Sequence, residues 1–106
     1  MQVHGAVLTG LALLLAATPA IAGPSMNTGW KATTLSQPDC VEKARGVLAA
    51  VGLGRLQSSQ ASAFAQQGDY SVVIRCIPEK AMVIFVVAGP EAAETQRLIR
   101  AVVERF

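Results

Sequence analysis

The sequence has few of the residue types that usually act in catalysis or bind metal ions. It contains one histidine (His4), two cysteines, one tryptophan and one tyrosine, and 15% of its residues are charged. Because that histidine lies in an apolar N-terminal segment, residues 5–106 contain none. A Ser-His-Asp or Cys-His nucleophile and the commonest transition-metal ligand are therefore excluded from this part of the chain. The sequence predicts a protein that is not an enzyme and that has no metal or cofactor.

Charge of either sign is sparse and unclustered. The chain has nine basic and seven acidic residues, a net charge of +2, and all of them follow residue 22. Nucleic-acid-binding proteins usually show a basic run or stripe, whereas the basic residues here stand singly. The acidic residues stand near expected helix ends or in expected turns, where carboxylates are usually structural. We expect no nucleic-acid partner and assign no catalytic residue.

Residues 1–22 are predicted to be a cleaved signal peptide. Residues 11–17 form a strongly apolar core, and Ala20 and Ala22 provide small side chains at the spacing that a signal peptidase recognises. Cleavage is expected between Ala22 and Gly23. An uncleaved anchor is the alternative, but the apolar core is shorter than the about 20 residues of a membrane span. We therefore expect a periplasmic or secreted protein with no membrane contact after cleavage.

The segment after the cleavage site is expected to be a flexible linker, and a single α+β domain, residues 29–106, is expected to follow it. Residues 23–28 are rich in Gly, Pro, Ser and Asn, which favours a mobile N-terminus. Residues 29–35 are a strand candidate that carries the only tryptophan, Trp30. A single tryptophan in a small domain usually packs in the core, so Trp30 is expected to contact the sheet edge or a helix, and stacking on a ligand is the alternative.

Two helices are predicted. The first begins after Ser36, a good N-terminal cap with Pro38 in the first turn, and ends before Gly52. Glycines that follow a helix do not form a phosphate-binding loop, which precedes one. The second helix is expected to begin at Pro90. Its apolar stripe comprises Thr95, Leu98, Ile99, Val102 and Phe106.

The strongest strand signal is a β-hairpin over residues 69–89. Its runs 70–77 and 81–88 are rich in β-branched residues and are joined by Pro-Glu-Lys. Residues 55–67 alternate small and polar side chains, which favours a strand, although a helix over 58–67 is the alternative. The predicted order is β-α-β-β-β-α: a two-layer α+β sandwich with two helices on one face of a mostly antiparallel four-stranded sheet.

Cys40 and Cys76 are predicted to form a structural disulfide between the first helix and the hairpin. Two cysteines in an exported chain are most simply explained by such a bridge. The alternative is a thiol-redox protein, because a cysteine in the first turn of a helix has a lowered pKa. The absence of a Cys-x-x-Cys motif argues against that alternative.

Both faces of the hairpin are apolar. With Glu79-Lys80 as the turn, Ile77 pairs with Met82, and the side facing the helices carries Val72, Ile74, Val83, Phe85 and Val87. The opposite side carries Phe64, Val73, Arg75, Ile77, Met82, Ile84 and Val86. A half-exposed antiparallel sheet normally alternates apolar with polar residues, so something is expected to cover this second face.

The expected function follows from that second face. We expect a small exported binding domain that acts through it, as a homodimer or on an envelope protein, with Arg75 as the one fixed charge on the face. A small amphipathic ligand carrying a carboxylate would also suit that arginine. The thiol-redox protein and a structural envelope protein are the alternatives.

Overall fold

The computed structural model describes residues 23–106, so the predicted signal peptide lies outside the described residues. The elements, in chain order, are β1 (Ser25–Ala32), α2 (Gln37–Ala50), β2 (Gln57–Ser58), β3 (Ser62–Gln67), β4 (Tyr70–Ile77), the 3-10 turn η1 (Pro78–Lys80), β5 (Met82–Gly89) and α3 (Ala92–Arg105).

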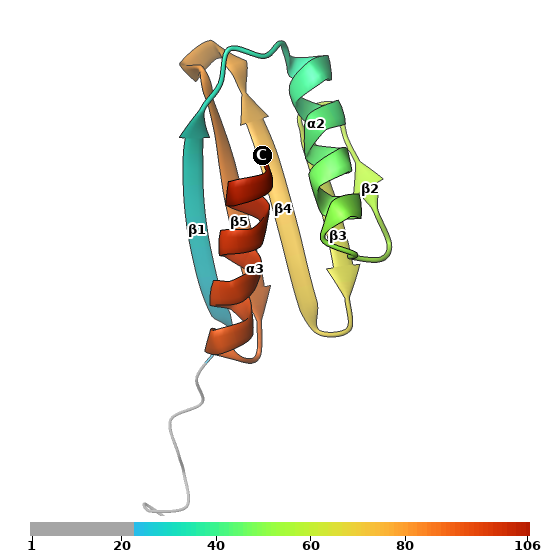
Figure 1. Ribbon diagram of the computed structural model, residues 1–106, viewed down its shortest axis with the longest axis vertical. Helices are drawn as coiled ribbons and strands as arrows, with labels where there is room; N and C mark the ends of the chain where they lie inside the picture. The colour runs from blue at the N-terminus through green and yellow to red at the C-terminus, as the bar shows by residue number, and fades with distance from the viewer. Residues whose placement is uncertain (1–22) are drawn as a thin grey trace, which may run out of the picture.

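The sheet has the strand order β1-β5-β4-β3-β2, and every neighbouring pair is antiparallel. Both helices pack on the same face, α3 over β1 and β5, and α2 over β3 and β4 (Figure 1). The α+β sandwich is therefore as predicted, with five strands in place of four. The additional strand, β2, has only two residues, too few to give a periodic signal.

The core lies between the sheet and the helices. The predicted helix-facing residues of the hairpin are fully buried, and Leu48 from α2 and Val102 from α3 pack against them. The rings of Phe85 and Phe106 meet edge to face with their centroids 5.6 Å apart. This contact joins the C-terminal end of α3 to the centre of the sheet.

The predicted boundary of the first helix is confirmed and that of the second is corrected. The Ser36 hydroxyl accepts a hydrogen bond from the Asp39 N–H at 3.3 Å and caps α2, and Gly52 follows the helix at a φ of +79°. The second helix begins at Ala92, not at Pro90. Glu91 stays extended because its N–H donates to the Tyr70 hydroxyl at 3.2 Å.

The hairpin has the predicted register, with Ile77 opposite Met82. Its connection is longer than the two-residue turn expected at Glu79-Lys80. Residues 78–80 form a 3-10 turn, and Ala81 closes it at a φ of 52° with its N–H donating to the Pro78 carbonyl at 2.9 Å. Residues 62–67 form strand β3, which settles the ambiguous segment in favour of a strand.

The first strand begins at Ser25, four residues before the predicted start, and takes in most of the expected linker. Residues 25–28 are held by pairing with β5 and by the Asn27 side chain, whose Nδ2 donates to Thr95 Oγ1 at 2.8 Å. Gly29 lets α3 approach closely, since a Cβ there would lie 3.1 Å from Val103 Cγ2. The pairing with β5 and the contacts with α3 therefore outweigh the turn-forming composition of residues 25–28.

Candidate functional site: the open sheet face

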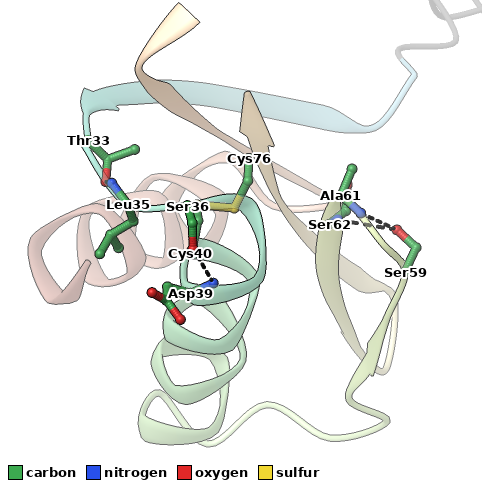
Figure 2. The surroundings of a disulfide bond; sticks show 9 residues. All are labelled: Thr33, Leu35, Ser36, Asp39, Cys40, Ser59, Ala61, Ser62 and Cys76. Atoms are coloured by element: carbon green, nitrogen blue, oxygen red, sulfur yellow. Dashed lines mark hydrogen bonds between the residues drawn. A yellow bond between two sulfur atoms is a disulfide. The ribbon is translucent and has the colours of Figure 1, made fainter. Parts of the chain in front are cut away.

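The predicted disulfide is present. Cys40 in the first turn of α2 and Cys76 near the end of β4 are bonded, with their Cα atoms 6.1 Å apart (Figure 2). The Cys76 N–H donates to the Ala61 carbonyl at 2.8 Å, so the same residue also joins β4 to the segment before β3. The disulfide therefore ties α2 to the hairpin, and the Cys76 backbone ties the hairpin to the segment before β3.

Both bonded cysteines are buried, with 1% of Cys40 and 3% of Cys76 exposed. Thiol–disulfide exchange requires a thiolate to reach one of the sulfur atoms. A redox-active cysteine also usually lies in a partly exposed, electropositive setting. The surroundings of this disulfide are those of a structural bond.

The face of the sheet that carries no helix is the candidate site. We call it the open face and define it by the registers of the four longer strands. It comprises Met26, Thr28, Trp30 and Ala32 of β1; Met82, Ile84, Val86 and Ala88 of β5; Ser71, Val73, Arg75 and Ile77 of β4; and Ser62, Phe64 and Gln66 of β3. The structure thus places all seven residues singled out in the sequence on one surface.

The prediction that Trp30 lies in the core is wrong. Its side chain is on the open face and 65% exposed, and Met26 on the same strand is 62% exposed. Sequence reasoning missed Met26 altogether because it lies in the expected linker. The signal was available as a period of two from Met26 to Ala32, which places alternate residues on one face of a strand.

Arg75 is the only charged residue on the open face and lies on the central strand β4. It is exposed, and within residues 23–106 its guanidinium has no hydrogen-bond or ion-pair partner. The strand residues that define the face include no carboxylate. The face therefore combines a broad apolar surface with one uncompensated positive charge.

A hollow of about 260 Å³ lies over β3 and β4, between Phe64 and Val73 of the open face, with Arg55 at its margin. It is continuous with the open face, because these two residues are directly opposite each other in the sheet. Its walls are mainly apolar side chains and the amides of Gln57 and Gln66, with one hydroxyl, that of Ser71, and no carboxylate or histidine that could act as a base. The hollow suits contact with an apolar group better than chemistry.

A larger depression of about 460 Å³ lies at the end of the sheet near Phe106. Its two lysines already have structural contacts. Lys31 Nζ donates to the Val103 carbonyl at 3.0 Å, and Lys43 Nζ lies 4.6 Å from the centre of the Phe106 ring. Both cations thus help to hold the end of α3.

Elsewhere on the surface of residues 23–106, the charged side chains form one ion pair. Within residues 23–106 no three His, Cys, Asp or Glu side chains lie close enough to hold a metal ion. Arg97 donates two hydrogen bonds to Glu94, at 2.8 and 2.7 Å, which lowers the pKa of that carboxyl. The two residues lie one turn apart on the exposed side of α3, and their opposite charges cancel.

In the described part of the chain, neither helix is long and apolar enough to cross a membrane. A search of protein-family models and of curated proteins finds no match to this chain.

Proposed function

We propose that this protein is an exported, non-enzymatic interaction domain whose open face is its binding surface. One observation carries the proposal: nine of the twelve open-face residues on β1, β5 and β4 are apolar. Among them are Trp30 and Met26, the two large hydrophobic residues of the described chain that are exposed. Contiguous apolar patches of this kind mark interaction sites in soluble proteins.

The proposed location is the periplasm or the extracellular space, after removal of residues 1–22. The disulfide supports this, because such bonds persist in oxidising compartments. The partner is a second copy of the chain or an envelope protein. No observation favours the redox alternative, since both cysteines are buried.

The proposal is tested by placing a charge on the open face. Ile84 lies on β5 at the centre of the face, whereas Ala93 is exposed on α3 at the other side of the molecule. We expect Ile84→Glu to lower the molar mass in solution or to abolish capture of envelope proteins, with Ala93→Glu behaving as wild type. Circular dichroism and thermal unfolding establish that both variants are folded.

If Ile84→Glu changes neither the molar mass nor the set of captured proteins, the open face is not the binding surface. Trp30→Ala is a second test that adds no charge and removes a side chain with few contacts in the monomer, since it is 65% exposed. Loss of binding in this variant would support the proposal even if Ile84→Glu failed to fold.

A further inference from the structure

We infer that the occupant of the open face is a second copy of the chain, stacked face to face so that Trp30 of each copy lies against Arg75 of the other. The inference rests on the proposed function and names its partner. Three observations carry it: the area of the face, the isolation of its one charge, and the position of Trp30 relative to that charge.

The area of the open face reaches the minimum for a specific dimer interface. Strands β1, β4 and β5 have eight residues each and are about 26 Å long, and β3 has six and is about 20 Å long. The four neighbouring strands are about 19 Å wide, so the open face has a planar outline of about 500 Å² or slightly less. Two copies would bury about 1,000 Å², the lower bound for a specific interface. Exposed side chains such as Trp30 project from this outline and add accessible area to it.

The charge on the face needs a partner that the face itself can supply. Burying the Arg75 guanidinium without a partner would weaken the dimer, because a charge removed from water without a partner carries a large desolvation penalty. The residues that define the open face include no carboxylate, so two copies cannot form an ion pair across it. They can offer the indole of Trp30, the aromatic ring on which an arginine stacks most favourably.

The register puts these two side chains in matching positions. Trp30 of β1 is opposite Ile84 of β5, and Ile84 is opposite Arg75 of β4. The three residues form one row across the sheet, with Trp30 and Arg75 each about 5 Å from Ile84. We place a twofold axis parallel to β5, midway between the two stacked sheets. Because β1 and β4 lie on opposite sides of β5, this axis puts β1 of each copy over β4 of the other.

In this arrangement Trp30 of each copy lies over Arg75 of the other copy, so the contact occurs twice. Ile84, which lies on the axis, meets Ile84 of the other copy. Aligned sheets cross at about 30°, which moves positions this close to the axis by only a few ångströms. Val86 and Met82 also lie on β5 and meet their counterparts along the axis. The interface is therefore apolar along the axis and has a cation–π pair on each side of it.

The first test is the molar mass of the protein, expressed as the full chain, with its processed N-terminus established by mass spectrometry. We expect a dimer, and Trp30→Ala is expected to raise its dissociation constant about 30-fold or more, as for a central aromatic anchor. A monomer at 100 µM overturns the second copy as occupant. The proposed function then depends only on partner capture by wild type and Ile84→Glu.

The second test probes the position of the axis. A cysteine at residue 84 would face its counterpart, but facing sheets lie about 10 Å apart, which is too far for a direct disulfide. Ile84→Cys is therefore expected to form a covalent dimer with a bis-maleimide cross-linker that spans about this distance. Arg100→Cys, exposed on α3, is the control and is expected to stay unlinked. A dimer that forms normally but is not cross-linked through residue 84 overturns this geometry and leaves the proposed function intact.

The third test exchanges the charges. Trp30→Arg would bring two guanidinium groups together and is expected to dissociate the dimer. The double variant Trp30→Arg/Arg75→Glu would replace each cation–π pair with an ion pair and is expected to restore it. Because restoration requires the two positions to meet across the interface, a double variant that stays folded and monomeric contradicts the proposed pairing.

Discussion

Removal of the disulfide is expected to destabilise the domain more than most single substitutions would. The bond joins residues 36 positions apart, and the chain-entropy model gives about 4 kcal/mol for closing a loop of this length. Small domains have total unfolding free energies of about 5–15 kcal/mol. Loss of the bond would therefore remove a large part of the stability and lower the melting temperature by about 15–30 °C.

The measurement is urea unfolding of three forms: oxidised wild type, reduced wild type and Cys40→Ala/Cys76→Ala. Reduced wild type retains both sulfur atoms, so its difference from the oxidised form isolates the cross-link. The double alanine variant is expected to lose about 1 kcal/mol more, because it also empties two buried positions. If reduction changes the unfolding free energy by less than 1 kcal/mol, the loop-closure reasoning is wrong for this protein.

Three further outcomes are expected. Gly89→Ala should cost about 1–3 kcal/mol in chemical unfolding, because a Cβ there overlaps the Tyr70 ring, and an unchanged midpoint would show that the ring moves freely. Leu48→Ala should cost about 3 kcal/mol, since Leu48 is fully buried between helix and sheet. Glu94→Gln should leave the melting temperature at pH 7 unchanged, because its pair with Arg97 is solvent-accessible. Since this pairing lowers the pKa of Glu94 in the folded state, any stabilisation it gives is present above the unfolded-state pKa of about 4.3 and is lost as the pH falls through the folded-state value.

Much of the fold could be predicted because local signals and tertiary contacts agree. Ser36 is a strong cap at the point where α2 begins, and the period of two in the hairpin gives its register directly. The disulfide could be anticipated because a chain with a predicted signal peptide contains two cysteines, and the helix-facing parity of β4 agrees by placing Cys76 on the side toward Cys40. These features depend on residues that are close together in the sequence, or on the alternation of side chains between the two faces of one strand.

The features that could not be predicted, namely the start of β1, the start of α3 and the position of Trp30, depend on contacts between residues far apart in the sequence. Ser25 to Thr28 look like a linker until β5 is present to pair with them, and Glu91 stays out of α3 because of a hydroxyl that is distant in sequence, that of Tyr70. The candidate site was therefore predicted without its outer strand. Trp30 was assigned to the core from the usual behaviour of tryptophan, whereas the registers of β1 and β5 put it on the open face.

The placement of β1 has a consequence for the order in which the sheet can form during synthesis. The strand lies at the beginning of the domain, yet its pairing partner β5 and the Thr95 side chain that binds Asn27 come near its end. A chain that emerges N-terminus first thus exposes β1 long before anything can pair with it. The sheet cannot be completed until almost all residues of the domain have emerged, so the pairing of β1 with β5 is a late step of folding.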